Sequence, residues 1–532
     1  MSARWKLALV ILFVFGTWPL YAQFNVASYG AVADCSTDNA TAFQNAINAA
    51  AANQNGGTVF IPAASTSTGC YVIKTPLKVQ GHRLTIKGQG LHNPALLFDF
   101  SAYVGTLPKY GFIVGETSTS AISATANYDS ARIEDLRMAM KGSGSSGGGI
   151  LVQRNPFFYV RAISIATNDT TAPGYGIRVI ASDSQVMIDQ VLIGSGDCAT
   201  SSQATSIAPA VGISIEDGSN QTFVHSSTIV ASATAIQVAN SVGVWIERNE
   251  ILSCASPDAT LYGVKIVTGQ AIPSYLTWLP AYITADVHVT ENIFEPLEFS
   301  AETIYDVYVG SGAPSSPSDH GATGVSIRDN LHLGTSASTR KLYTFDYADQ
   351  AFLNNAHWIG TVTTIATITA NASKTTVDLP DMTTYNTAGT PTIISDAGYQ
   401  SVIVGRYMSP AFASGDYSTL TSPATWTVDS SDVATNEYTV HHKRMHMIVW
   451  LGSTTVSGGN PYALYVKIPG GFVAAKAALT LARVVDNGNV TVGFATVGTG
   501  SSAIQVSRSD GAPFAVSANN TYAQFEFDFE VQ

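Results

Sequence analysis

A seven-residue pattern occurs three times in the middle of the chain: WIERNEI (245–251), HVTENIF (288–294) and SIRDNLH (326–332). From its second residue onward, each copy has an apolar residue, two mostly polar residues, Asn, and usually an apolar residue at the sixth place. This alternation is typical of strands with one buried face. Looser copies are RIEDLRM (132–138), YVRAISI (159–165), MIDQVLI (187–193), FVHSSTI (223–229) and AFLNNAH (351–357).

A second strand-like pattern precedes most of these copies, as in GIRV (176–179) and GISI (212–215). Each repeat therefore contains at least two short strands. A unit this small cannot bury its own inner face, so it must stack on the next unit. Only 12% of the residues are charged, against about 25% in ordinary domains, as expected if half of every strand faces an interior. We therefore predict a parallel β-solenoid.

The Asn of the repeat has a structural explanation. Asn249, Asn292, Asn330 and Asn355 occupy the same place in successive copies. A column of buried amides can form hydrogen bonds along a stack and satisfy backbone groups at a corner. We therefore expect these four residues to form a ladder and not a sugar-binding site.

The N-terminal stretch FNVASYGAVADCSTDNATAFQNAINAAAANQNGGTVFIPAASTSTGCYVIKTPLKV (24–79) predicts a strand, a glycine turn, an amphipathic helix and two more strands. Phe43, Ala46, Ile47 and Ala50 fall on one face of that helix. A helix at this end would cover the open edge of the solenoid, which would otherwise favour aggregation.

This stretch resembles the opening of the pectate-lyase-like superfamily, in particular the domain shared by rhamnogalacturonase, exported polygalacturonases, some epimerases and phage tailspikes. The shared elements are YGA, the STDN turn, an A-x-Q-x-A-I helix, GGTVFIP and the YVI and PL strands. The resemblance implies an all-β fold, a right-handed parallel β-helix over residues 23–405 with an N-terminal capping helix. It does not imply one reaction, because the superfamily includes lyases, hydrolases, epimerases and non-catalytic binders.

The catalytic signature of the polygalacturonases is incomplete in this chain. Their Asn-Thr-Asp motif precedes a Gly-Ile strand, but here Pro-Gly-Tyr (173–175) stands in that place. GSGDC (194–198) offers one Asp, Asp197, where that family has two. A single carboxyl cannot provide the acid and base of inverting hydrolysis. The chain therefore looks like a relative without that machinery.

Residues 1–22 have the pattern of a secretory signal peptide. Arg4 and Lys6 precede an apolar run, and Ala22 is a small residue at the expected cleavage site. The apolar run of 12 residues (7–18) is shorter than the roughly 20 needed to cross a bilayer. We expect a secreted, periplasmic or cell-surface protein with no membrane span after the signal is removed.

Four cysteines in an exported chain favour disulfides. Cys35 and Cys70 both lie in the N-terminal stretch and are candidates for one bond, whereas the pairing of Cys198 and Cys254 is left open. The spacings match no zinc pattern, so the sequence names no metal ligands.

The chain is acidic, with 26 Lys and Arg against 38 Asp and Glu and a net charge of −12. That balance argues against nucleic acid as a partner. Without Arg4 and Lys6 the charge becomes 24 − 38 = −14. An acidic polysaccharide would need a local basic patch or bound Ca²⁺, which favours a neutral or mixed glycan. No cofactor is required, although a lyase could use Ca²⁺.

The first candidate site is a column of residues from the Asn-containing repeats. Asp189, His225 and Glu247 take the same outward position on consecutive coils, which lie about 4.8 Å apart. A carboxylate on each side favours the charged form of His225, which suits a general acid or base. A solvated ladder of charges on an exposed strand face would give the same pattern.

A second candidate column comes from the GIRV-like strands. Arg178 and Lys265 lie on it, and β-elimination needs a base as well as a cation beside a uronate carboxylate. Glu216 and Asp217 end one of these strands and could act as acids or bind Ca²⁺. Ordinary exposed strand residues and a plain acidic turn are the alternatives.

Substrate contacts are expected from long corner insertions at 196–211, 268–286 and 310–323. The middle insertion carries Tyr275, Trp278 and Tyr282, whose rings could contact sugars or form a small core under the loop. Arg328, in the outward position of its repeat, is a further candidate for substrate binding.

The end of the chain has a different pattern. Residues 406–424 are rich in Ser, Thr, Pro and Gly and are predicted to be a linker. Short alternating strands in 425–532, such as QFEFDFEV (524–531), predict a small antiparallel β-sandwich. One run, TNEYTVHHKRMHMIVWLGSTTVSG (435–458), resembles C-terminal modules of phage tail fibres, which implies trimerisation or glycan recognition.

Two hypotheses follow for function. The first is a polysaccharide-cleaving hydrolase or lyase. The second is a non-catalytic glycan-binding or adhesive surface protein, for which a homotrimer is a candidate assembly. The superfamily resemblance favours the enzyme, whereas the incomplete polygalacturonase motifs favour the binder.

Overall fold

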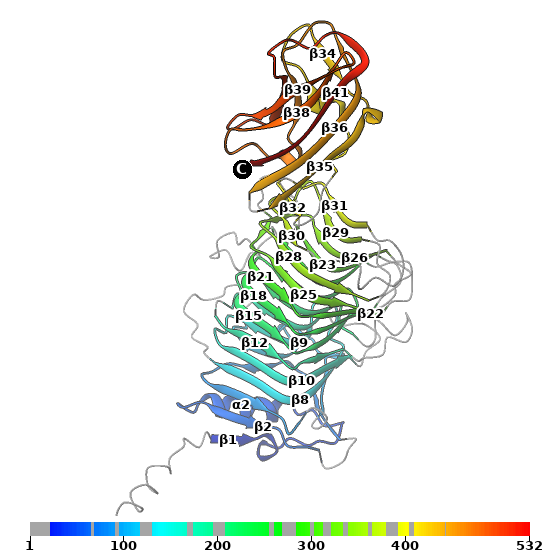
Figure 1. The fold of residues 1–532 in the computed structure, drawn as a ribbon. Coiled ribbons are helices and arrows are strands. Elements are labelled where there is room, and N and C mark those ends of the chain that lie inside the picture. Colours follow the sequence, from blue (N-terminus) through cyan, green and yellow to red (C-terminus); the bar gives the residue numbers. More distant parts are fainter. Residues whose placement is uncertain are drawn as a thin grey trace, which may run out of the picture. The chain divides into compact units, whose positions relative to one another are not determined.

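Most of the described chain is β-structure (Figure 1). The computed structural model describes residues 22–64, 69–90, 95–117, 130–167, 174–182, 184–194, 208–254, 260–268, 284–297, 303–311, 321–333, 339–359, 364–378, 392–398, 400–403, 409–441 and 443–532. The chain divides into two compact units. The first unit comprises residues 1–347, 356–367 and 383–394, and the second comprises 348–355, 368–382 and 395–532.

The first unit begins with β1 (Ala22–Asn25), a short 3-10 helix (Val26–Tyr29) and α2 (Ala40–Ala51). Alanine-rich sequence favours the helix, and the predicted face of Phe43, Ala46, Ile47 and Ala50 is buried. Figure 1 shows α2 at the start of the stacked strands, as predicted for a capping helix.

The predicted disulfide is confirmed. Cys35 and Cys70 are bonded, with their Cα atoms 4.7 Å apart. The backbone N–H of Cys35 also donates to the Cys70 carbonyl at 2.9 Å. The segment that precedes α2 is therefore tied covalently to the first coils.

The rest of the first unit consists of three rows of parallel strands. The first strand row contains β2 (Gly57–Phe60), β5 (Leu84–Lys87), the first halves of β8 (Ala131–Lys141) and β10 (Phe158–Thr167), β12 (Val186–Asp189), β15 (Asn220–His225), β18 (Val242–Glu247), β21 (Ala285–Thr290), β24 (Ala322–Thr323) and the first half of β25 (Ser326–His332).

The second strand row contains β3 (Cys70–Ile73), β6 (Ala95–Asp99), the second halves of β8, β10 and β25, and β13 (Leu192–Ile193), β16 (Thr228–Ala231), β19 (Glu250–Cys254) and β22 (Ile293–Leu297). The third strand row contains β4 (Leu77–Val79), β7 (Tyr110–Gly115), β9 (Gly148–Gln153), β11 (Tyr175–Ile180), β14 (Val211–Glu216), β17 (Thr234–Ala239), β20 (Leu261–Thr268), β23 (Thr303–Ser311), β26 (Thr339–Phe345), β29 (Thr364–Ile368) and β31 (Thr392–Asp396).

The chain visits the rows in a fixed order, as in β14, β15, β16 and β17, so each circuit forms one coil. Strands of neighbouring coils pair in parallel and in register. Val224 lies over Ile246, and Ile246 over Val289, and all three are fully buried. The predicted parallel β-helix, with apolar residues inside, is confirmed.

The turn between the first and second rows is short because one residue takes a left-handed conformation. Arg248, Glu291 and Asp329 have φ between 51° and 55°, which is uncommon for residues other than glycine. In each case the next residue is a ladder Asn. This tight corner leaves backbone groups without partners on their own coil, so a neighbouring coil must supply them.

The asparagine ladder is confirmed at three of its four predicted positions. Asn292 is fully buried and donates from Nδ2 to the Ile246 carbonyl at 2.8 Å and to Asn330 Oδ1 at 3.1 Å. Its Oδ1 accepts from the backbone N–H and the Nδ2 of Asn249, both at 3.0 Å. Each amide therefore joins its own coil to the coils before and after it.

The fourth position, Asn355, was wrong by one residue. Asn355 itself has φ 50°, so it takes the left-handed place that Asp329 takes in the preceding repeat. Leu353, not Phe352, is the fully buried residue of this repeat. Counting from Leu353 puts the ladder position on Ala356, which has no amide.

We predict that Asn292→Ala lowers the free energy of unfolding by about 3 kcal/mol, because it leaves buried backbone groups of two coils without partners. The urea midpoint measures the loss. Asn45→Ala on the exposed face of α2 is the control and should change stability by at most about 0.5 kcal/mol. Equal urea midpoints for the two variants would contradict a stabilising role of the asparagine ladder.

A charged cluster lies buried inside the first unit. Arg340 Nη2 donates to Asp306 Oδ2 at 2.7 Å, and His332 Nδ1 lies 2.6 Å from the same oxygen. The other ring nitrogen, His332 Nε2, lies 2.6 Å from the Tyr343 hydroxyl. Burial by itself would raise the pKa of Asp306, but Arg340 and His332 outweigh it and hold that pKa below its usual value. Asp306, His332, Arg340 and Tyr343 are at most 2% exposed, so the cluster is structural.

Asp306→Asn should destabilise the protein by about 3 to 5 kcal/mol, because Arg340 would keep its buried charge without a carboxylate. The matched control is Asp286→Asn, since Asp286 is exposed and its ion pair with His288 should contribute at most about 1 kcal/mol. Urea unfolding of both variants checks this, and a D306N midpoint at the control's value would refute it.

The second unit contains parallel strands β27 (Ala348–Asp349), β28 (Phe352–Trp358), β30 (Thr376–Asp378) and β32 (Val402–Ile403), followed by an antiparallel sheet of nine strands. These nine are β33 (Tyr417–Ser418), β34 (Thr425–Thr427), β35 (Val433–His441), β36 (Arg444–Ser457), β37 (Leu464–Lys467), β38 (Ala478–Asp486), β39 (Asn489–Val497), β40 (Ala503–Arg508) and β41 (Ser517–Glu530). Three short 3-10 helices lie at Ser414–Asp416, Ser430–Asp432 and Pro469–Gly471.

The antiparallel sheet curls around one core, in agreement with the predicted antiparallel C-terminal fold. Tyr417 in β33 and Trp426 in β34, at opposite ends of the sheet, meet with ring centroids 5.8 Å apart. The predicted linker (406–424) needs one correction, because Tyr417 and Ser418 pair with β37 and belong to the sheet. Tyr417 is buried in the core, which gives this polar stretch its anchor.

No helix in the described part of the chain is long and apolar enough to cross a membrane.

Candidate functional site

Each of the three long insertions has a strand of the third row at one of its ends. The insertion at 196–211 leads into β14, the one at 268–286 follows β20, and the one at 310–323 follows β23. By contrast, only two residues separate β15 from β16 and β18 from β19. Since binding residues are concentrated in loops on a rigid scaffold, this arrangement favours the outer face of the third row as the functional face.

That face carries the second predicted column, in the predicted register. Each member lies beside its neighbour in a parallel pair of strands. The column runs through Leu151, Arg178, Ser214, Gln237, Lys265 and Tyr308.

Arg178 and Glu216 form a close ion pair on this face. Arg178 Nη2 donates to Glu216 Oε2 at 2.7 Å, and its Nε lies 3.2 Å from both carboxylate oxygens. The Ser214 hydroxyl donates to Glu216 Oε1. Burial opposes the charge of Arg178, but Glu216 outweighs it and raises the pKa of Arg178. The guanidinium also stacks on Tyr175, 4.7 Å from the ring centroid. Arg178, Ser214 and Glu216 therefore form one hydrogen-bonded group on this face.

The neighbouring Asp217 has the opposite environment. It is 4% exposed and forms no ion pair with any residue that the structure describes, and Asn240 Nδ2 donates to its Oδ1 at 3.2 Å. Burial raises the pKa of Asp217 to about 6. Asp217 therefore keeps its proton at mildly acidic pH, where an ordinary aspartate has lost it, and a carboxyl group of this kind is a candidate proton donor.

Lys265 and three tyrosines extend the face beyond Glu216. Lys265 Nζ lies 4.4 Å from the centroid of the Tyr262 ring, and burial lowers the pKa of Lys265. Tyr262 stacks on Tyr305 at 5.3 Å. The Tyr308 hydroxyl donates to Asp346 at 3.0 Å. The tyrosines present apolar edges and hydroxyl groups, a combination that suits sugars.

Tyr175, Tyr262 and Tyr305 were missed by the sequence analysis, although the sequence contains a signal for them. Each stands directly before a GIRV-like pattern: before Gly176, Gly263 and Asp306 in turn. They therefore share one place in the repeat, and a search for aromatic residues at fixed repeat positions would have found them.

The first predicted column is in register on the outer face of the first row. Asp189 pairs with His225, and His225 with Glu247. His225 Nδ1 lies 3.6 Å from Glu247 Oε2, whereas Asp189 lies 3.6 Å from Arg161 Nε. These contacts fit a ladder of partly exposed ion pairs, and a catalytic role for the three residues stays a prediction.

Several predicted residues lie outside the described residues: Tyr275, Trp278, Tyr282, Cys198, the side chain of Cys254 and residues 1–21 of the predicted signal peptide. Arg328 is described and exposed, and its Nε donates to the Ser326 hydroxyl at 3.0 Å. Its predicted role in substrate binding stays a prediction.

The raised pKa of Asp217 has a consequence for stability. An unfolded Asp titrates near 3.9, so between about pH 4 and 6 the folded protein holds a proton that the unfolded chain releases. The stabilising effect is complete below the unfolded pKa and is lost as pH rises through about 6.

We predict that Asp217→Asn gains about 2 to 3 kcal/mol of stability relative to wild type at pH 8 and almost nothing at pH 4. Urea unfolding at both pH values tests this. Asp329→Asn is the control, because Asp329 has the same left-handed backbone, with φ 51°, but is exposed. A D217N gain that does not depend on pH would contradict the assignment.

Residues 23–257 match the family model described as rhamnogalacturonase A/epimerase, pectate lyase-like. The match covers the N-terminal stretch and the first coils, and it confirms the resemblance to the pectate-lyase-like class. No curated protein matches the sequence.

Solved structures with a similar course of the chain include the Dettilon tailspike protein, with 10% identity, a TM-score of 0.57, and coverage of 96% of this chain and 94% of that chain. PfbA, a surface adhesin of Streptococcus pneumoniae, has 12% identity, a TM-score of 0.43 and coverage of 79% and 98%. DFA-IIIase from Arthrobacter chlorophenolicus A6, in complex with GF2, has 13% identity, a TM-score of 0.43 and coverage of 70% and 98%. At these identities the tailspike likeness shows a shared fold and no more.

Proposed function

We propose that this pectate lyase-like β-helix protein is a polysaccharide-cleaving enzyme that binds its substrate along the outer face of the third strand row. The observation that carries the proposal is the pair of adjacent carboxyl groups with opposed environments, Glu216 beside Arg178 and Asp217 with no ion pair to any described residue. The pair ends a strand on the face that the long insertions join. Perturbed carboxyl groups on such a face are candidates for catalysis.

Of the two enzyme classes, hydrolysis fits this pair better than elimination. Glycoside hydrolysis needs one carboxylic acid to protonate the leaving oxygen and one carboxylate to assist water or the sugar. Asp217 can give the proton at mildly acidic pH, and Glu216, which is paired with Arg178, is the candidate for the second carboxyl group. A lyase would instead use Lys265, whose lowered pKa suits a base. The described residues contain no group of three or more His, Cys, Asp or Glu that could hold a metal, and Ca²⁺ for a lyase stays a prediction.

A glycan-binding protein without catalysis is the second candidate. Glu216 and Asp217 are 5% and 4% exposed, and the Glu216 carboxylate is already engaged by Arg178 and Ser214. If these acids are only structural, Tyr262, Tyr305 and Lys265 would form a sugar-binding face. Homotrimer formation, which tail-fibre modules exemplify, belongs to this candidate.

We further propose that the protein works outside the cytoplasm. The Cys35–Cys70 disulfide supports an oxidising compartment, and residues 1–22 have the pattern of a signal peptide. Export would place the protein where polysaccharides are found, in the medium, the periplasm or at the cell surface.

The test is an activity screen on neutral and uronate polysaccharides, with detection of reducing ends and of unsaturated products that absorb in the ultraviolet. We expect new reducing ends, with a rate that falls as pH rises above about 6, because Asp217 must be protonated to act as an acid. Asp217→Asn and Glu216→Gln should each lower kcat by about 100-fold or more, while Asp329→Asn retains it.

Two results would overturn this assignment. Loss of activity in His225→Ala and Glu247→Ala, with full activity in D217N, would move the site to the first row. If wild type forms no product from any substrate but still binds glycans, non-catalytic glycan binding would remain as the function.

A further inference from the structure

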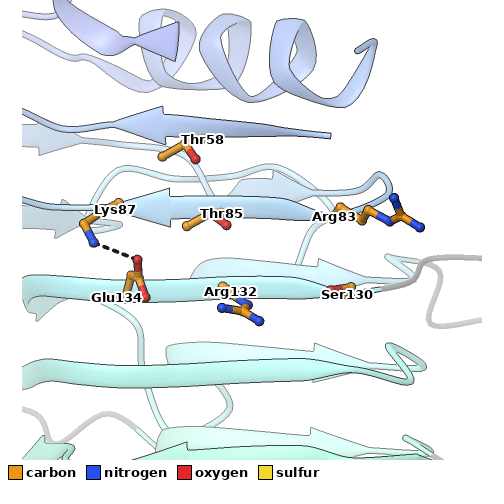
Figure 2. Close-up of a pocket in the computed structure, with 7 residues that line it drawn as sticks. All are labelled: Thr58, Arg83, Thr85, Lys87, Ser130, Arg132 and Glu134. Carbon is orange, nitrogen blue, oxygen red and sulfur yellow. Dashed lines mark hydrogen bonds and ion pairs between the residues drawn. The ribbon is translucent and has the colours of Figure 1, made fainter. Parts of the chain in front are cut away.

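A polar pocket of about 500 Å³ opens on the outer face of the first strand row, near α2 and away from the third row (Figure 2). β2, β5 and β8 form its wall, with Thr58 beside Thr85 and Thr85 beside Arg132 in register. Its volume lies in the range of about 300 to 1,000 Å³ that is usual for ligand sites.

The pocket is lined by side chains of unequal length. Thr58, Thr85 and Ser130 have short side chains, and Arg83 and Arg132 have long ones. Hydroxyl groups and guanidinium groups can all donate hydrogen bonds. The pocket therefore offers several donors to one ligand.

The charges of the pocket are not balanced. Lys87 is engaged by two carboxylates, Glu134 at 2.9 Å and Asp135 at 3.2 Å. Arg83 and Arg132 form no ion pair with any described residue. Arg132 instead lies over the ring of Tyr159, 5.6 Å from its centroid. Two guanidinium charges thus face the pocket without an acidic partner in the described part of the chain.

We propose that this pocket binds the acidic group of a sugar residue, a carboxylate or a sulfate ester, within a polysaccharide. Guanidinium groups bind planar and tetrahedral oxyanions through paired hydrogen bonds. The hydroxyl groups of Thr58, Thr85 and Ser130 can donate to the ring oxygens and hydroxyl groups of the same sugar. The proposal rests on the proposed function only in that the ligand is a polysaccharide.

A polymer fits this position better than a free small anion. The pocket lies on an open strand face, and the same outward position continues along the row through Tyr159, Met187, Phe223 and Trp245. A glycan chain could therefore leave the pocket in the direction of the row without meeting a wall of strands.

The negative net charge of the chain limits where an acidic polysaccharide can bind. At −12 overall, the protein repels a polyanion except where local cations exceed local acids. The pocket would then orient a mixed glycan by its acidic residues, and the outer face of the third row would remain free to act on another part of the chain.

The test compares wild type with the double variant Arg83→Gln/Arg132→Gln in binding to polygalacturonate, dextran sulfate and neutral dextran, at 50 mM and 200 mM salt. We expect the double variant to bind at least one polyanion about tenfold or more weakly, with neutral dextran unaffected. The polyanion that shows the loss identifies carboxylate or sulfate as the group. Free galacturonate and inorganic sulfate as competitors show how much of the affinity needs the polymer.

Arg444→Gln/Arg483→Gln is the matched control, because both arginines are exposed and their replacement removes the same two charges from the second unit. Equal weakening by this control would reduce the effect to net charge and overturn the proposal, as would equal affinities of wild type and the Arg83→Gln/Arg132→Gln variant. Arg83 and Arg132 are exposed, so we expect the Arg83→Gln/Arg132→Gln variant to have the melting temperature of wild type. If its melting temperature is lower, Arg132→Lys, which keeps the positive charge, is measured in its place and should bind the polyanion more tightly than that double variant does. Cleavage of a neutral glycan without binding of any polyanion would refute the pocket and leave the proposed function intact.

Discussion

Stacking in register is the constraint on which the rest of this structure depends. A coil of three short strands cannot close its own hydrogen bonds, so every backbone group at a corner needs a partner on the coil above or below. The left-handed residues before Asn249, Asn292 and Asn330 make the corner tight, and the amides satisfy the groups that the tight corner exposes. Apolar residues then fall over apolar residues, and the interior becomes continuous.

The same constraint gives the protein its candidate functional surfaces. Residues at one place in the repeat form a column in which neighbouring members are about 4.8 Å apart. A column therefore brings together side chains from segments that are far apart in sequence. Arg178 reaches Glu216 from the neighbouring coil in this way. The outer faces of the rows have different characters: the third row has buried acids and tyrosines, and the first has ion pairs and a basic pocket.

The sequence predicted the coils, the capping helix, the disulfide and the register of both columns, because a repeat fixes which residues share a position. It misplaced Asn355, since an apolar residue stands at two neighbouring places, Phe352 and Leu353, and only burial shows which one starts the repeat. It also placed Tyr417 in a linker. One buried aromatic ring can anchor a polar stretch to a core, but a single residue hardly changes the composition of the stretch, so composition does not reveal it.

The sequence by itself determined that this chain is a parallel β-helix with an antiparallel end and that its N-terminal part resembles the pectate lyase-like class, because periodic strands and the N-terminal motifs are local features. It left open which column is the site. The tertiary structure decided that the long insertions join the third row, that Asp217 is buried with no ion pair to any described residue, and that Arg83 and Arg132 share one pocket with Lys87. Burial and pairing depend on neighbours from other coils, and no local pattern contains them.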